Sequence, residues 1–348
     1  MIWAQLTSRR SLRDIESSLR AHSDKNRMGI GTAISRNNIA AANAARDVAI
    51  YRELALEMMR RAGRLPASDD ILTRVGNIFR LNGFFAIDSS TVSLELKNFS
   101  WSAPQNGWGG IKLHTMFDLL RKVPRMCLIT GHEERDQSFM EYYPYERACF
   151  YMLDKSYFKS TGMYRIHSNG AFFITRLKRN VVYRVEKKEV VNGEHVFSDE
   201  TIRFTSRWAR QGYPDSLRLI RFYSAEKNIV LTFISNNFDI DAATIALLYR
   251  YRWQIELFFR WIKQHLRITA FYGTSANAVM IQIYTAYTAF CILAMAADAA
   301  GYRGSLYEFS NIVSVSLTEK VTLRDLIKRY RYQSDEVVQD KIPSLFDI

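Results

Sequence analysis

Short apolar runs in the middle of the chain predict five buried strands. Each run is four to ten residues long, which suits a strand better than a helix, and two of them lead directly into an aspartate. The runs are Phe84–Ile87, Ile111–Leu120, Val123–Thr130, Cys149–Leu153 and Ala171–Thr175. The pattern therefore predicts a sheet between residues 80 and 175.

A second strand-rich region is expected between residues 176 and 235. Val181–Val185 alternates between apolar and polar side chains, and Leu217–Tyr223 and Ile229–Ile234 are further apolar runs. Asn192-Gly193 is the dipeptide that tight hairpin turns prefer. Helical spacing resumes after Asp241, and a single helix is predicted from Ile245 to Leu266.

The first 65 residues are predicted to be helical. Leu12, Ile15 and Leu19 recur at helical spacing, Ser11-Leu-Arg-Asp14 resembles a capping box, and Ser35 can cap a long helix through 38–61. A turn containing Gly29 and Gly31 would separate two helices that carry six arginines: Arg9, Arg10, Arg13, Arg20, Arg36 and Arg46. A DNA-reading helix-turn-helix and an ordinary helical hairpin with a solvated basic face fit these residues equally well.

One uncharged stretch, Ala278–Ala297, is about long enough to cross a bilayer. It contains Gln282, two tyrosines and two threonines, and it is rich in alanine rather than leucine or isoleucine. We therefore expect a helix buried in the protein core, and no membrane partner.

Composition points to a packed protein with a polyanionic partner. The chain has 348 residues, is 48% hydrophobic, and carries 48 Lys and Arg against 35 Asp and Glu, a net charge of +13. Such an excess favours nucleic acid or an anionic surface as partner. The three cysteines, Cys127, Cys149 and Cys291, are scattered and form no metal-binding or disulfide pattern, which suits a reducing cytoplasm.

The candidate chemistry lies in three acids, Asp88, Asp154 and Glu256. Taken singly, Asp88 and Asp154 could simply cap the ends of their strands, and Glu256 could be a solvated helix residue. The helix around Glu256 favours a functional role. At about 100° per residue, Tyr249, Arg252, Glu256 and Lys263 fall within a sector roughly 60° wide. An Arg252–Glu256 pair at i,i+4 would explain two of these residues but not the aligned set.

A carboxylate among cations on an otherwise apolar helix fits a phosphodiester site. Phosphoryl transfer needs charge neutralisation and alignment more than covalent chemistry from the protein. Three clustered carboxylates repel one another, so we expect them to hold Mg²⁺ or Mn²⁺, with two ions serving the attacking and leaving oxygens.

These motifs resemble those of a known family. Tyr249, Arg252, Glu256 and Lys263 match in type and spacing the YREK signature of the insertion-sequence-four family of bacterial DDE transposases. Residues 256–279 also resemble the family's sequence around this signature. Residues 86–94 (AIDSSTVSL) and 151–158 (YMLDKSYF) resemble the first and second acidic motifs, and residues 11–21 resemble the N-terminal region. The likeness extends over nearly the whole chain. Two positions depart from the pattern: Ser156 stands where glycine is usual, and Arg135-Asp136 where His-Asp is common.

The resemblance implies an α/β fold, a ribonuclease-H-like core with an inserted β-rich subdomain, plus helical N-terminal and C-terminal regions. The expected divisions are a shortened helical DNA-binding region (1–78), the first part of the core (79–175), the insertion (176–238), the catalytic helix (239–275) and a C-terminal helical region (276–348). The separation of Asp154 and Glu256, 256 − 154 = 102 residues, agrees with such an insertion.

By the same resemblance, Asp88, Asp154 and Glu256 are catalytic metal ligands, and Tyr249, Arg252 and Lys263 contact DNA. The implied function is metal-dependent cleavage at insertion-sequence ends and strand transfer into target DNA, by a homodimer bound to double-stranded DNA in the bacterial cytoplasm. The alternative is a catalytically impaired DNA-binding relic or transposition inhibitor. A nuclease of other biology on the same fold is a third hypothesis.

Overall fold

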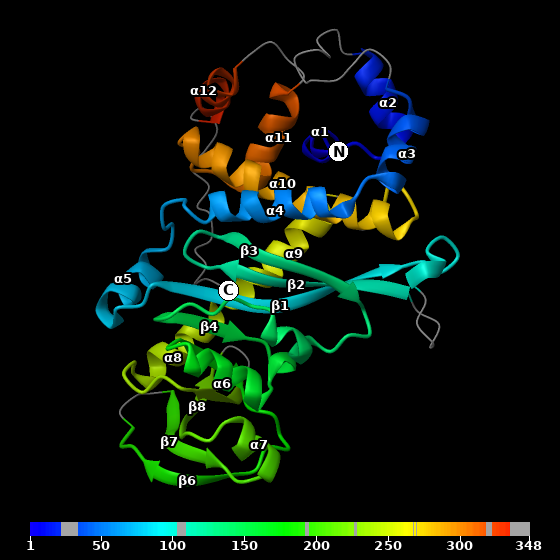
Figure 1. Cartoon of the computed structure of the whole chain (residues 1–348). Coiled ribbons are helices and arrows are strands. Elements are labelled where there is room, and N and C mark those ends of the chain that lie inside the picture. The colour runs from blue at the N-terminus through cyan, green and yellow to red at the C-terminus, as the bar shows by residue number, and fades with distance from the viewer. Residues whose placement is uncertain are drawn as a thin grey trace.

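The computed structural model describes residues 1–21, 34–102, 109–191, 195–225, 228–266, 268, 270–317 and 322–334. Within these residues one nine-stranded sheet runs through the molecule, with helices gathered at one end and along its faces (Figure 1). The spatial strand order is β3-β2-β1-β4-β5-β9-β8-β7-β6. The strands are β1 Gly83–Leu94, β2 Gly109–Asp118, β3 Val123–Gly131, β4 Cys149–Leu153, β5 Phe172–Arg176, β6 Tyr183–Lys188, β7 Val196–Phe204, β8 Leu217–Ser224 and β9 Ile229–Ser235.

The five strands predicted before residue 176 are confirmed as β1 to β5. β1, β2 and β3 form an antiparallel meander, whereas β1, β4 and β5 pair in parallel. One boundary was wrong: the first strand does not end before Asp88 but continues to Leu94. The reason is pairing, because Asp88 to Leu94 lie opposite Thr115 to Gly109 on β2.

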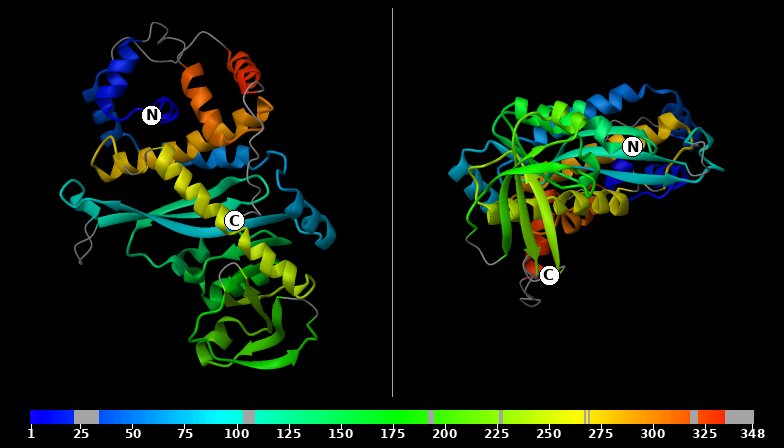
Figure 2. Two further views of the ribbon diagram at one scale, coloured as in Figure 1. Left: turned by 180° about the vertical axis from the view of Figure 1, so that it is seen from behind. Right: turned by 90° about the horizontal axis from the view of Figure 1, so that it is seen from below.

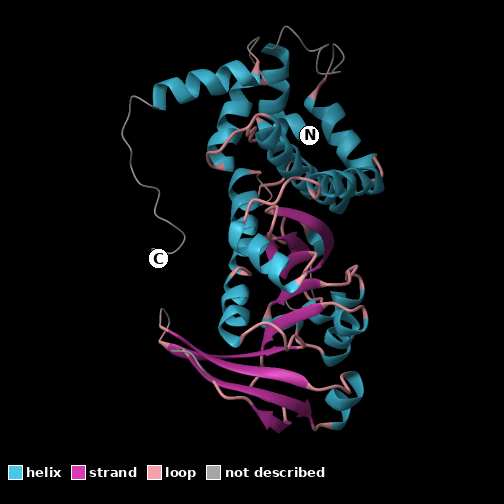
Figure 3. Ribbon diagram, turned by 90° about the vertical axis from the view of Figure 1, so that its left-hand side faces the viewer, coloured by secondary structure: helices cyan, strands magenta, loops and turns pink. Residues whose placement is uncertain are grey.

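The strand-rich region after residue 176 is also confirmed, as β6 to β9. These strands continue the same sheet, because β9 pairs antiparallel with β5 (Figure 3). The junction is tied by Ser235, whose hydroxyl donates to Phe173 O at 2.6 Å, and by Asn236, which bonds the backbone of Phe173 and Ala171. The turn predicted at Asn192-Gly193 lies outside the described residues.

Helices flank the sheet and form a layer beyond its β3 edge (Figures 1 and 2). They are α1 Ile2–Leu6, α2 Leu12–Ala21, α3 Arg36–Ala45, α4 Val48–Ala62, α5 Asp70–Phe79, α6 Ser160–Ser168, α7 Arg207–Gly212, α8 Ala242–Arg250, α9 Trp253–His265, α10 Ala276–Ala299, α11 Leu306–Ser316 and α12 Leu323–Ser334. Short 3₁₀ helices are η2 Ser100–Ser102, η3 Asp136–Glu141 and η4 Lys155–Tyr157. Behind the sheet, α9 crosses from the lower strands toward the helical layer (Figure 2).

The N-terminal helices are present, but the long helix predicted over 38–61 is divided. Ser35 caps α3 as expected, accepting from Asn38 N, and then the helix ends at Ala45. Asp47 starts α4 by accepting from Ala49 N at 2.8 Å, so a second N-cap competes with continuation. The turn predicted around Gly29 and Gly31 lies outside the described residues, and the choice between helix-turn-helix and hairpin stays open.

The apolar stretch forms α10 as a core helix. By length and composition α10 could cross a membrane, but 78% of its most apolar 18-residue window is buried inside the protein. Its polar groups have protein partners: Gln282 accepts from Tyr272 N and donates to Ala270 O, and the Tyr287 hydroxyl lies 2.7 Å from Thr115 Oγ1. These contacts explain why Gln282 and Tyr287 stand in an otherwise apolar helix.

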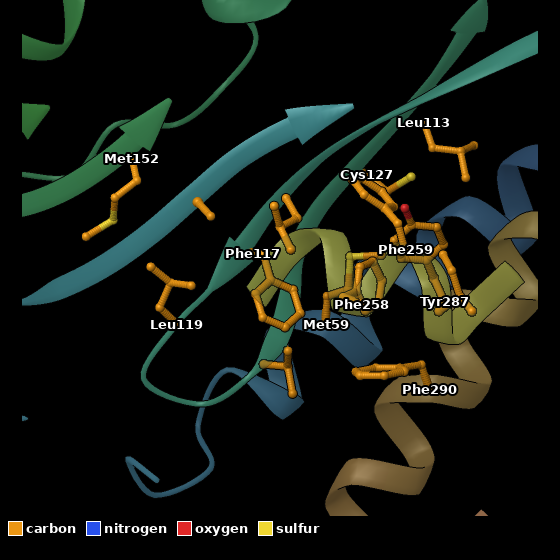
Figure 4. Close-up of a cluster of buried hydrophobic side chains, with 14 of the residues drawn as sticks. Met59, Leu113, Phe117, Leu119, Cys127, Met152, Phe258, Phe259, Tyr287 and Phe290 are labelled. Atoms are coloured by element: carbon orange, nitrogen blue, oxygen red, sulfur yellow. The ribbon is translucent and has the colours of Figure 1, made fainter. Parts of the chain in front are cut away.

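The two faces of the sheet have separate cores. Phe84, Ala86, Phe150 and Met152 point to the side covered by α4, α9 and α10, where Phe117 and Phe258 pack with ring centroids 5.1 Å apart (Figure 4). Their neighbours Phe85, Ile87, Tyr151 and Leu153 point to the opposite side, toward α6 and η3. This alternation decides on which face each polar residue of β1 and β4 lies.

Candidate active site

Asp88 and Asp154 come together because β1 and β4 are adjacent and parallel. Ile87 and Leu153 are register partners, and Asp154 N donates to Ile87 O at 3.3 Å. Asp154 ends its strand and partly caps η4 by accepting from Ser156 N at 3.4 Å, so the capping explanation holds for that residue alone. Asp88 lies inside β1, so strand-end capping does not account for it.

Glu256 reaches the same place from α9. The single helix predicted from Ile245 to Leu266 is instead two helices, with Tyr251 and Arg252 forming a tight turn between α8 and α9. The backbone stays in the right-handed region there, and Arg252 N bonds Tyr249 O, three residues back. Arg252 and Glu256 are still neighbours at i,i+4. The apolar side chains of this helix are not all buried, since Leu257 is 38% exposed.

Arg252 joins two of the three acids. Its Nη1 donates to Asp88 Oδ2 at 2.8 Å, and its Nη2 donates to Glu256 Oε1 at 2.5 Å. Among the described residues its buried Nε has no hydrogen-bond partner. Burial would lower the pKa of Arg252, but Tyr249, Asp88 and Glu256 raise it above its usual value, so the guanidinium is charged.

The three acids of this cluster repel one another. Burial raises the pKa of Asp88 to about 7; Arg252 opposes this rise, and the carboxylates of Asp154 and Glu256 add to it. One guanidinium therefore faces three carboxylates that are close enough to repel one another. A divalent cation would relieve this repulsion.

Tyr249 and Lys263 lie on either side of this cluster. The Tyr249 ring packs on Phe233, with centroids 4.8 Å apart, and Arg252 lies 5.8 Å from the Tyr249 ring centre. Burial raises the pKa of Tyr249 to about 12; Arg252 opposes the rise and Asp154 adds to it, so the phenol is neutral and can donate. Lys263 is about two turns beyond Glu256 on α9. Its Nζ donates to Thr91 O on β1 at 2.7 Å.

The donor chemistry of the three acids fits magnesium or manganese. Both ions prefer oxygen ligands from carboxylates, and all three side chains are partly exposed and can be reached from solvent. In the described part of the chain, no three Asp, Glu, His or Cys side chains form a ready-made ion cluster. Arg252 lies between Asp88 and Glu256, so holding an ion requires this arginine to give up at least one carboxylate.

The sequence prediction missed a second group of polar residues behind the acids. Asp136 accepts from Ser89 Oγ at 2.7 Å and pairs with Lys112 Nζ at 3.2 Å, while His114 Nδ1 lies 3.8 Å away. Burial lowers the pKa of His114 to about 4, so the ring is neutral. The one available signal was the Arg135-Asp136 pair, at a position where the resembled family often has His-Asp.

Two lysines and an arginine stand beside Asp154. Lys178 Nζ donates to Phe158 O at 3.3 Å, and burial, together with the nearby Lys155, lowers its pKa, while Asp154 opposes that shift. Arg176 ends β5 close enough to Tyr249 to affect its ionisation. Cations thus border the acidic cluster on the side of β4 and β5, as a phosphate-binding surface requires.

Known proteins resemble this chain over most of its length. It is 32% identical to y4zB of Sinorhizobium fredii, which is named as a transposase, over 287 residues covering 81% of this chain and 77% of that protein. It is 27% identical over 212 residues to a Geobacillus stearothermophilus protein named as a transposase for insertion sequence element IS5377, covering 60% of this chain and 55% of that protein. A Synechocystis protein named as a transposase for element IS4SA is 22% identical over 271 residues, covering 76% of this chain and 72% of that protein.

A solved structure also aligns with the whole molecule. It is a piggyBac transposase synaptic complex with hairpin DNA, at a TM-score of 0.41 and 13% identity, covering 99% of this chain and 86% of that chain. The family described as "Transposase DDE domain" matches residues 81–292, a range that contains all six predicted site residues. Because this family match spans more than half of the chain, the chain belongs to the DDE transposase family.

Proposed function

We propose that this protein is a DNA transposase that cuts at the ends of an insertion sequence and joins the freed 3′ ends to target DNA. The observation that carries the proposal is the meeting of Asp88, Asp154 and Glu256 from β1, β4 and α9 around one arginine. The order β3-β2-β1-β4-β5, an antiparallel meander followed by parallel strands, supports a ribonuclease-H-like core. β6 to β9 would then be its insertion, and Tyr249, Arg252, Glu256 and Lys263 support membership of the insertion-sequence-four family.

In this mechanism the three acids hold two Mg²⁺ or Mn²⁺ ions. When bound by Asp88, Asp154 and Glu256, such ions would supply charge neutralisation at the scissile phosphate and activation of an attacking oxygen. Asp88 and Asp154 are on a rigid sheet, whereas Glu256 is on a helix that packs across β1, so the three ligands are fixed relative to one another. Arg252 donates to Asp88 at 2.8 Å and to Glu256 at 2.5 Å, so it could bind a phosphate oxygen once an ion takes over one of these carboxylates.

Tyr249 and Lys263 would contact the DNA backbone beside the cut. The neutral phenol of Tyr249 on α8 can donate to a phosphate oxygen, and Lys263 provides a positive charge on α9. The net charge of +13 supports double-stranded DNA as the partner, in the bacterial cytoplasm at the nucleoid. Because two element ends must be held together, we propose a homodimer on DNA.

The test uses a duplex with the inverted repeats that bracket the reading frame, incubated with Mg²⁺ and a target plasmid. Wild type should nick the repeat end and join it to the plasmid. Glu256→Gln removes a metal ligand and should react at least about 10³-fold more slowly, which corresponds to about 4 kcal/mol of barrier. Glu141→Gln, at a carboxylate 60% exposed on η3, is the matched control and should keep activity. Equal cleavage by Glu256→Gln would refute the assigned mechanism, and binding by wild type without cleavage would favour the inhibitor alternative.

A further inference from the structure

The carboxylate of Asp136 contacts both chain segments that present the catalytic aspartates. From the first segment, Ser89 Oγ donates to Asp136 Oδ1 at 2.7 Å. From the second, Ser156 lies close enough to interact with the same carboxylate. Burial would raise the pKa of Asp136, but Ser89, Lys112 and Ser156 together lower it. Ser89 directly follows Asp88, and Ser156 is two residues after Asp154.

The two aspartates and Asp136 lie on opposite faces of the sheet. Asp88 belongs to the face of Phe84 and Ala86, where α9 packs, whereas Ser89 belongs to the face of Phe85 and Ile87. Asp136, at the start of η3, therefore acts on Asp88 through the β1 backbone. Ser89 is suited to transmit this restraint, because its backbone N–H also donates to Asp88 Oδ1 at 2.8 Å.

Asp136 is itself held from β2. Lys112 Nζ pairs with Asp136 at 3.2 Å and also donates to Glu134 O at 2.7 Å. His114, the register partner of Ser89, stacks on Phe139 of η3 with ring centroids 4.0 Å apart. His114 Nδ1 also lies 3.1 Å from the hydroxyl of Tyr157, which ends η4 just after Asp154.

We propose that Asp136 is a positioning residue that holds the Asp88 and Asp154 segments at the separation needed to share a divalent cation. This inference rests on the proposed function, because it assumes that the two aspartates bind the ion together. A carboxylate is suited to the task, since it can accept from Ser89, Ser156 and Lys112 at once. The serine at 156, where the resembled family usually has glycine, gives this chain a hydroxyl for the second contact.

The experiment measures Mn²⁺ binding by the full chain without DNA, from the free-ion electron paramagnetic resonance signal. Asp136→Ala should weaken Mn²⁺ binding by about 10-fold or more, as loss of a residue that orients metal ligands does. Asp136→Asn, which keeps one acceptor oxygen, should fall between Asp136→Ala and wild type. Glu141→Gln on the same 3₁₀ helix is the matched control and should bind as wild type does.

Variants of the two serines separate positioning from folding. Ser89→Ala should weaken Mn²⁺ binding more than Ser156→Ala, and the double variant most, while all of them keep the Asp136–Lys112 pair and the wild-type Tm in EDTA. Wild-type Mn²⁺ affinity in Asp136→Ala, or a lowered Tm with unchanged affinity in the serine variants, would overturn the proposal. Wild type and Asp88→Asn test the premise separately: if Asp88→Asn binds Mn²⁺ as wild type does, the proposed metal site fails and this inference with it.

Discussion

Two partly or fully buried arginines, Arg218 and Arg252, stand in opposite electrostatic surroundings. Arg218 on β8 makes a two-pronged pair with Asp199 on β7, at 2.9 and 2.6 Å, and donates its remaining Nη1 to the carbonyls of Asn237 and Ile240. Arg252 shares its guanidinium between Asp88 and Glu256 with Asp154 nearby, and its Nε lacks a partner among the described residues. Arg218 is paired with one acid, whereas Arg252 is shared between two acids that a third one repels.

This difference separates a structural ion pair from a reactive one. The Arg218–Asp199 pair links β7 and β8 to the segment that leads into α8, so it helps to fix the helix that carries Tyr249. Every group in the pair has its partner, and nothing remains to bind a ligand. Around Arg252, in contrast, three partly exposed carboxylates share one guanidinium, as expected where an ion is to be bound.

The largest expected effect tests the comparison by removing one acid from each group. Asp199→Asn leaves the buried Arg218 charge without its counter-ion and should lower the free energy of unfolding by about 3–5 kcal/mol. Asp88→Asn relieves repulsion among three acids and should leave that free energy unchanged or higher in EDTA. Urea unfolding at pH 8, followed by circular dichroism, measures both.

The control for this pair is Asp215→Asn, at an acid 51% exposed between α7 and β8, which should change stability by less than about 0.5 kcal/mol. A loss of several kcal/mol in Asp88→Asn would mean that the Arg252 group is also a structural pair. The distinction drawn between the two arginines would then be wrong.

The sequence predicted most strands of this fold because each is an apolar run bounded by polar residues. It placed the end of the first strand too early, since the pairing of Asp88–Leu94 with β2 is a long-range contact that no local pattern of DSSTVSL reveals. It also joined helices that the structure divides at Arg46-Asp47 and at Tyr251-Arg252. Helical spacing continues across both breaks, whereas the caps and tight turns that cause them depend on one or two residues.

For the site, motif and helical spacing identified six residues, and the structure brings five of them into one electrostatic cluster with Lys263 further along α9. Arg252 lies outside the regular part of α9, yet the i,i+4 pair with Glu256, which was weighed as an alternative explanation of these two residues, does form. Asp136, Lys112 and His114 were missed. They lie near Ser89 because of the register between β1 and β2 and the position of η3. Neither can be predicted from the spacing of residues along the sequence.

A smaller effect concerns how stability depends on pH. Beside Asp136, on the opposite face of the sheet from Arg252, lies the buried His114, whereas the described partners of Arg218 include no histidine. The pKa of His114 is about 4 in the folded protein, against about 6.5 in an unfolded chain. Between these values the unfolded state binds the extra proton, so stability falls as pH decreases from 6.5 to 4. The loss reaches about 3 kcal/mol at pH 4.

Urea unfolding of wild type and His114→Gln at pH 7 and pH 4.5 measures this contribution. The variant cannot take up the proton, so its stability should change less between the two pH values than that of wild type. Equal changes in the two proteins would show that His114 is not the group responsible.

The smallest expected effect concerns Lys263, which is proposed to contact DNA rather than to stabilise the fold. Lys263 donates to Thr91 O, has no carboxylate partner among the described residues, and has its pKa lowered by burial. If it contacts a phosphate, Lys263→Ala should weaken binding of an end duplex and reduce the slope of log affinity against log salt by about 0.9, which corresponds to one phosphate contact. Fluorescence anisotropy between 50 and 200 mM salt measures the slope, with Lys328→Ala on α12 as the exposed control. An unchanged slope in Lys263→Ala would instead make this lysine a structural partner of β1, as Arg218 is of β7.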